Sequence, residues 1–70
     1  MSQEIRKILA KNIEKLRTSK HLGKEELSLA LGVDNSYISK LEKGRINITL
    51  DKIEQIANYF ETEAYLLLKD

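Results

Sequence analysis

Apolar side chains recur at intervals of three or four residues along almost the whole chain, which is the spacing of an amphipathic α-helix. The sequence shows no alternating apolar run, no Asn-Gly or Asp-Gly hairpin signal and no proline. The pattern therefore predicts an all-α protein, a five-helix bundle that forms a single domain over residues 1–70. The apolar stripe of a long first helix consists of Ile5, Ile8, Leu9, Ile13 and Leu16.

Capping residues set the expected limits of these helices. Ser2 is the predicted N-cap of the first helix, and a loop follows at Ser19–Gly23. Thr49 is the predicted cap of a fourth helix, and a short fifth helix is expected over Ala64–Lys69. The inner face of the fourth helix is predicted to carry Leu50, Ile53, Ile56, Ala57 and Phe60.

The middle of the chain is its most informative part, because it predicts two short helices at about 24–31 and 35–43. Gly32 can take the left-handed backbone that ends the first of them. A small side chain at Ser28 allows the second helix to cross closely over the first. Asp34 is the expected N-cap of the second helix and Gly44 its terminating residue, while Ile38 and Leu41 point inward.

The outward face of that second helix carries short or flexible hydrogen-bonding groups. They are Asn35, Ser36, Ser39 and Lys40. Asparagine pairs with adenine, serine can donate or accept, and lysine reaches guanine O6 or N7. A helix with this face fits the major groove of DNA, so the pattern indicates a DNA-binding regulator.

Composition argues against several other classes of protein. The chain has 70 residues, of which 41% are hydrophobic and 33% charged, as in a folded and soluble domain. No apolar run approaches the roughly 20 residues of a membrane span, and the first residues lack the apolar core of a signal peptide. Cysteine is absent, which excludes disulfides. We therefore expect a cytoplasmic protein without a membrane partner.

The net charge of +1 is distributed unevenly. Residues 1–24 sum to +5, residues 25–45 to −1 and residues 46–70 to −3. Such a domain can present a basic face to a polyanion while its acidic end faces away. The alternative, that these charges only solvate helix surfaces, stays open.

The sequence does not predict an enzyme. His21 is the only histidine, and no pair of carboxylates falls in an expected pocket. We expect no catalytic residue, no metal site, no cofactor and no small-molecule ligand.

The sequence resembles the XRE family of helix-turn-helix proteins, which includes lambdoid phage repressors and Cro proteins. The resemblance covers nearly everything from Ile13 to Leu68. It is carried by Asn12–Arg17, Lys24–Val33, Asn35–Gly44 and Ile53–Phe60. It implies a lambda repressor-like fold with the helix-turn-helix at about 24–43, and a sequence-specific regulator of transcription. Phage Cro-like proteins and restriction–modification controllers fit equally well, as do repressors and activators.

The resemblance also implies roles for individual residues. Base contacts are expected from Asn35, Ser36, Ser39 and Lys40. Phosphate contacts are expected from Lys24, Tyr37, Lys43, Arg45, Asn47 and Thr49. For Tyr37, a ring that merely covers the helix pair is an equally open alternative. Arg17 and Glu42 match residues that form a structural ion pair in the family.

Some positions depart from the family pattern. Gly23 replaces the serine or threonine that usually caps the second helix. Ser28 stands where alanine is commonest and must find a hydrogen bond. Glu61 stands where glycine is frequent, which leaves the path of the chain into the fifth helix open.

The C-terminal segment carries more apolar surface than a small domain easily hides. We therefore expect a homodimer, joined chiefly through the fifth helix, on a palindromic operator with half-sites about 34–36 Å apart. The predicted interface is Tyr59, Tyr65, Leu66, Leu67 and Leu68. Two alternatives stay open. In one, these side chains all complete the monomer core; in the other, the protein is an antitoxin-type interaction module with secondary DNA binding.

Overall fold

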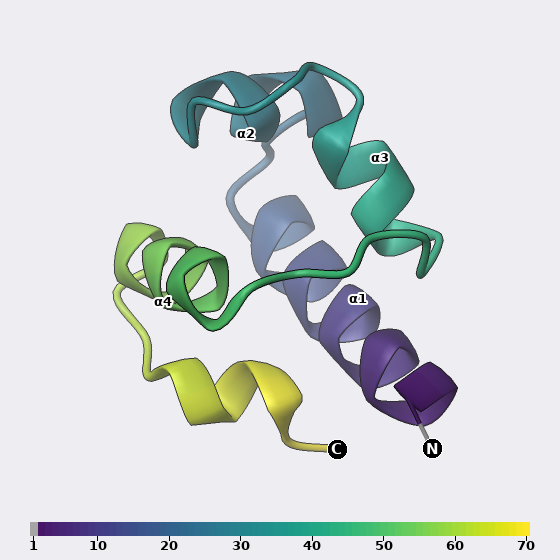
Figure 1. The fold of residues 1–70 in the computed structure, drawn as a ribbon. Helices are drawn as coiled ribbons and strands as arrows, with labels where there is room; N and C mark the ends of the chain where they lie inside the picture. Colours follow the sequence, from purple (N-terminus) through teal and green to yellow (C-terminus); the bar gives the residue numbers. More distant parts are fainter. Residues whose placement is uncertain (1) are drawn as a thin grey trace.

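The structure is a computed structural model that describes residues 2–70, with side chains from Glu4 onward. Figure 1 shows four α-helices followed by a short 3-10 helix. This described part of the chain contains no strand, so the all-α prediction is confirmed. None of its helices is long and apolar enough to cross a bilayer. The elements are α1 (Ser2–Ser19), α2 (Lys24–Ala30), α3 (Tyr37–Glu42), α4 (Leu50–Tyr59) and the 3-10 helix η1 (Ala64–Leu68).

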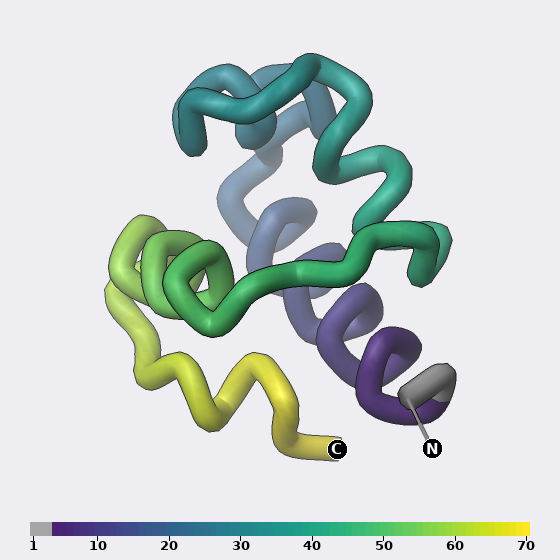
Figure 2. Tube along the Cα trace, in the orientation of Figure 1, coloured from purple at the N-terminus to yellow at the C-terminus, as the bar shows by residue number. Residues whose placement is uncertain are grey.

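The long helix α1 holds the other elements together. It contacts both α3 and η1, while α2 packs against α3 and α4 packs against η1. In the view of Figures 1 and 2, the loop that leaves α3 crosses in front of α1 before it enters α4. The whole body measures 30 × 23 × 21 Å. Ser2, the predicted N-cap, is the first residue of α1, and its side chain lies outside the described residues.

A single apolar cluster fills the space between these elements. Its members come from all four α-helices, from the C-cap residues of α2 and α4, and from η1, and they fall largely at the positions that the helical spacing predicts. The buried residues of the cluster are Leu9, Ile13, Leu27, Leu31, Ile38, Leu41, Ile53, Ile56, Ala57, Phe60 and Leu67.

Two side chains that were predicted to face inward lie in solvent instead. Leu50 is 77% exposed and Ile5 is 54% exposed. Each occupies the first turn of its helix, where the neighbouring elements no longer cover it. Helical spacing gives the direction of a side chain, but it does not show where the covering neighbour ends.

The prediction of a fifth α-helix is wrong, because the segment forms the 3-10 helix η1. Its backbone bonds span three residues, from the Leu66 amide to the Glu63 carbonyl at 3.0 Å, for example. A piece this short gains little from α-helical cooperativity. The side-chain amide of Asn12 donates to the carbonyls of Leu67 at 2.7 Å and Lys69 at 2.9 Å, which ties the segment to α1.

One residue of the predicted dimer interface belongs to the core of the monomer. Leu67 is only 1% exposed and packs in the apolar cluster, so it is not available to a second copy. Leu66 and Leu68, its neighbours, do not belong to that cluster and are partly exposed.

Candidate nucleic-acid interface

The turn between α2 and α3 is built on a glycine. Gly32 has a φ of +72°, in the left-handed region. Its amide donates to the carbonyl of Leu29 at 3.0 Å, and the amide of Val33 donates to the carbonyl of Ser28 at 3.1 Å. These two bonds form a Schellman motif, which satisfies the free carbonyls at the end of α2 and turns the chain toward α3.

A fully buried hydroxyl joins the two helices. The Oγ of Ser28 donates to the carbonyl of Lys24 at 2.9 Å and accepts from the amide of Ile38 at 3.1 Å. Ile38 stands in the first turn of α3, where amides lack partners inside the helix. Ser28 therefore finds the hydrogen bond that it needs, and it fixes the position of α3 on α2.

The prediction of the start of α3 was two residues early. The helix begins at Tyr37, so Asn35 and Ser36 lie in the turn that precedes it. Asp34 does not cap the first helical turn; its carboxylate accepts bonds from the backbone amide and the hydroxyl of Ser36. These bonds lower the pKa of Asp34, which keeps the carboxylate charged and holds an Asx-type turn.

The four predicted base-contacting residues lie close together along the turn and α3, although they do not all lie on the helix. Asn35 and Lys40 are exposed, and Ser36 and Ser39 are half-buried. The hydroxyl of Ser36 already donates to Asp34, so it can offer DNA only its acceptor capacity. Asn35 and Lys40 are thus the two of the four that are accessible to a ligand.

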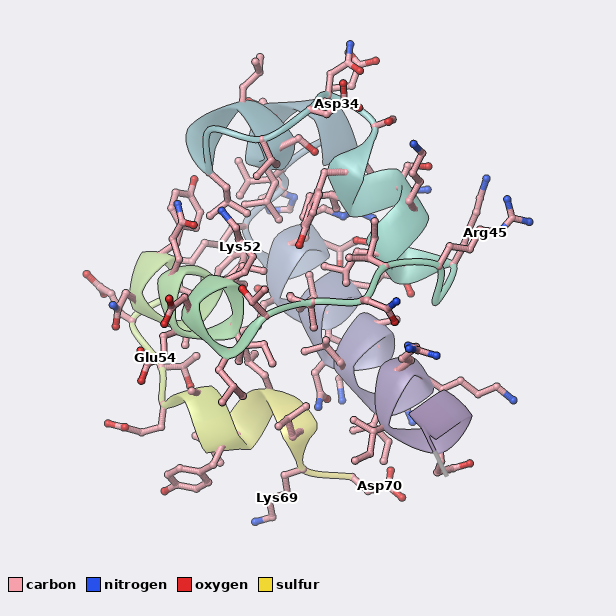
Figure 3. The ribbon with its side chains drawn as sticks, viewed as in Figure 1. Asp34, Arg45, Lys52, Glu54, Lys69 and Asp70 are labelled. Carbon is pink, nitrogen blue, oxygen red and sulfur yellow. The ribbon has the colours of Figure 1, made fainter. Side chains whose placement is uncertain are left out.

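The side chains predicted to contact phosphates come from four different places in the chain. Lys24 is exposed at the start of α2, and Lys43 and Arg45 are exposed at the end of α3. Figure 3 shows Asp34 and Arg45 at opposite ends of α3, with Arg45 projecting away from the body. Tyr37 is half-buried against the core, and burial raises the pKa of its hydroxyl, which stays protonated and able to donate.

The remaining two predicted phosphate contacts also hold the loop in place. Thr49 caps α4, since its hydroxyl oxygen accepts from the amide of Lys52 at 3.1 Å. Asn47 accepts, through its side-chain oxygen, a hydrogen bond from the guanidinium of Arg6. Near its α4 end, the loop is thus bonded to α1 through Asn47 and caps α4 through Thr49.

The sequence reasoning missed Arg6, which lies next to this loop. The sequence did contain a signal that Arg6 faces the other elements. One stripe of α1 carries, at helical spacing, Arg6, Leu9, Ile13 and Arg17. The guanidinium of Arg6 adds a positive charge beside Asn47 and orients that side chain.

Arg17 and Glu42 form an ion pair that ties α1 to the end of α3. The Nε and Nη2 of Arg17 lie 2.7 and 3.2 Å from the two carboxylate oxygens of Glu42. A third bond runs from Nη1 to the carbonyl of Leu22 at 2.8 Å. The hydrogen bond to Glu42 raises the pKa of Arg17, so the guanidinium stays charged.

Two short helices joined by a glycine turn, with the outer face of the second open to a ligand, define a helix-turn-helix domain. The chain belongs to the XRE family of helix-turn-helix proteins, since the family described as "Helix-turn-helix" matches residues 13–67. Members of this family are DNA-binding regulators of transcription, and the comparisons indicate no enzyme family.

Individual relatives agree with this assignment. A hypothetical transcription factor from Neisseria meningitidis is 39% identical over 66 residues, which are 94% of this chain and 62% of that protein. The chain thus spans less than two thirds of that relative. The crystal structure of a hypothetical Neisseria transcription factor, NHTF, superposes with a TM-score of 0.89 at 38% identity, covering 99% of this chain and 79% of the other.

A second similar structure is that of a protein with a known regulatory class, a restriction-modification controller. The restriction-modification controller protein C.AhdI from Aeromonas hydrophila superposes with a TM-score of 0.80 at 31% identity. The match covers 89% of this chain and 94% of the controller.

Proposed function

We propose that this protein is a sequence-specific regulator that binds a palindromic operator as a homodimer, with α3 of each copy in the major groove. The observation that carries the proposal is the buried Ser28 hydroxyl, which locks α3 onto α2 with its polar face outward. A recognition helix needs such a rigid support, because base readout depends on side chains held in register with the groove.

The charged side chains around α3 suit a duplex. Three basic side chains, Lys24, Lys43 and Arg45, are exposed, as are Asn35 and Lys40, which we propose to read bases. Phosphate contacts of this kind supply affinity that depends on salt, and base contacts supply the sequence preference. The likeness to C.AhdI supports a regulator of the controller type.

Two copies are proposed because a single α3 reads only a few base pairs. A two-fold axis doubles the readout and imposes an inverted repeat with half-sites about 34–36 Å apart. Four side chains of the predicted interface are exposed enough to meet a partner: Tyr59, Tyr65, Leu66 and Leu68.

Substitutions at two lysines test the DNA surface. Lys40→Ala should weaken binding to a selected operator by about 1–3 kcal/mol, because a base contact is lost. Lys43→Ala should weaken binding to all duplexes alike and lower the salt slope by about one unit, because a phosphate contact is lost. Binding would be measured by fluorescence anisotropy over a range of salt concentrations.

The matched control is Lys15→Ala, which removes the same charge from the side of α1 next to η1. Circular dichroism would show that all three variants stay folded. If Lys40→Ala bound the operator as tightly as the original protein, the assignment of α3 as the recognition helix would be wrong.

A further inference from the structure

Asp34 places a negative charge inside the surface that is proposed to meet DNA. It stands one residue before Asn35 in the turn that leads into α3, and both side chains are exposed. Figure 3 shows Asp34 at the start of α3, at the end of the helix that lies away from Arg45. A carboxylate at this place repels the phosphate groups of a duplex, so its charge lowers the affinity for every DNA sequence. The presence of that charge therefore needs an explanation.

The hydrogen bonds that Asp34 makes within the chain do not require a charge. Its Oδ2 accepts from the amide of Ser36 at 3.0 Å and from the hydroxyl of the same residue. The side-chain oxygen of an asparagine holds the same kind of turn, and the hydroxyl of a serine does so more weakly. Because a neutral side chain is enough for the turn, the turn alone does not explain the carboxylate.

The carboxylate has acceptor capacity left for a ligand. Both bonds from Ser36 end on Oδ2, so Oδ1 takes part in neither. The carboxyl group stays ionised, because the hydrogen bonds from Ser36 and the nearby ammonium of Lys40 lower its pKa. An ionised carboxylate only accepts hydrogen bonds. A ligand group that meets Oδ1 must therefore be a donor.

Only two bases present a hydrogen-bond donor in the major groove. The donors are the N4 amino group of cytosine and the N6 amino group of adenine. The adenine amino group lies beside N7, an acceptor that repels a carboxylate, whereas cytosine presents its amino group alone. Guanine and thymine present acceptors, which a carboxylate also repels. A carboxylate that reaches the base edges therefore selects cytosine.

We propose that Asp34 is a specificity-determining residue, whose carboxylate accepts a hydrogen bond from the N4 amino group of a cytosine in each half-site. The inference rests on the proposed function, because it needs α3 in the major groove. Lys40 complements this role, since lysine reaches the O6 and N7 acceptors of guanine. Its ammonium is close enough to affect the pKa of Asp34, so the two opposite charges suit the two bases of a G·C pair or of neighbouring pairs.

Selection from a randomised duplex library, run in parallel on the original protein and on Asp34→Asn, tests the inference. Asparagine keeps a side-chain oxygen for Ser36, loses the charge and gains a donor. The original protein should enrich cytosine at one fixed position of each half-site, by roughly fivefold or more, the lower end for a specific base contact. Asp34→Asn should lose the preference at that position and keep the preferences elsewhere.

A second measurement separates the loss of a base contact from damage to the turn. Because a repulsive charge is removed, Asp34→Asn should bind a duplex of unselected sequence about twofold or more tightly, by fluorescence anisotropy. Weaker binding to that duplex would mean that the turn is damaged, and would assign Asp34 to the turn alone. The matched control is Asp70→Asn, which removes the same charge at the lower edge of the molecule in Figure 3 and should change neither result.

The possible results separate this inference from the proposed function. Loss of the cytosine preference in Asp34→Asn, with tighter binding to unselected DNA, supports the role of Asp34. An unchanged preference, or no selected cytosine in the half-site of the original protein, overturns that role and leaves the proposed regulator standing. If circular dichroism shows that Asp34→Asn is unfolded, Asp34→Ser keeps an acceptor for the turn and should give the same loss. An original protein that enriches no sequence would overturn the proposed function, and the role of Asp34 with it.

Discussion

At the scale of single residues, the ends of the α-helices divide into two kinds. In all four, the residue after the C-cap has a left-handed backbone, and two amides donate back to carbonyls three and five residues earlier. After α2 and α3 that residue is Gly32 or Gly44, with φ of +72°. After α1 and α4 it is His21 or Glu61, with φ of +57° and +56°. A residue with a Cβ atom is strained there by about 1 kcal/mol.

Relief of this strain should stabilise the protein. Glu61→Gly is expected to raise the free energy of unfolding by about 0.5–1 kcal/mol, because glycine adopts the left-handed region without cost from a Cβ atom. Urea denaturation followed by circular dichroism would measure the change. The matched control is Glu63→Gly, two residues away in extended backbone, which should lower stability. Equal losses in both variants would contradict the interpretation of strain.

Residue type predicts only the helix ends that glycine forms. Gly32 and Gly44 were expected to end α2 and α3, and both do so. Nothing in the chemistry of His21 marks it as a left-handed residue, and the only indication at Glu61 is that glycine is frequent at this position in the family. Local propensity cannot show where packing forces a residue other than glycine into the strained left-handed conformation.

At the scale of elements, the ion pair between α1 and α3 is the contact most sensitive to a single substitution. Arg17 and Glu42 have side chains only 10% and 7% exposed. Arg17→Ala would leave a shielded carboxylate without its partner, which costs about 3–5 kcal/mol. A domain of this size has about that much stability in total. The variant should therefore be largely unfolded at room temperature, by circular dichroism.

A double variant distinguishes two contributions to the lost stability: the free-energy cost of leaving the Glu42 carboxylate unpaired, and the loss of the contact between α1 and α3. Arg17→Met with Glu42→Leu replaces both charges by apolar groups of similar size, which is often neutral for a buried pair. It should recover most of the helical signal. If it were as unfolded as Arg17→Ala, the contribution of the pair would lie in its hydrogen bonds, including the one to Leu22.

The sequence predicted which helices form better than it predicted the residues at which they begin and the type of helix that results. Apolar spacing located every α-helix, because each one buries a stripe at that period. The start of α3 and the 3-10 form of η1 escaped prediction for a shared reason. Ser28 reaches across to the amide of Ile38, and Asn12 reaches across to the carbonyls of η1, and both are long-range hydrogen bonds that local patterns do not encode.

At the scale of the whole molecule, two surfaces lie apart in the sequence. The proposed DNA surface is centred on α3, and an apolar groove opens beside Leu50. The sequence located the first, because its residues are contiguous along the helix-turn-helix. It placed Leu50 in the core, because helical period alone cannot show that the groove stays open above it. In the view of Figure 3, Arg45 projects to the right from the end of α3, while Lys69 and Asp70 lie at the lower edge of the molecule.

Selection from a randomised duplex library at near-physiological salt is the sharpest test of sequence-specific binding by a homodimer. We expect enrichment of an inverted repeat whose half-sites lie about 34–36 Å apart, or close to one turn of DNA. Lys40→Ala in the same selection should relax the preference within each half-site without changing their spacing. Failure of the folded original protein to enrich any sequence would contradict sequence-specific binding, and enrichment of a single unrepeated site would contradict the homodimer.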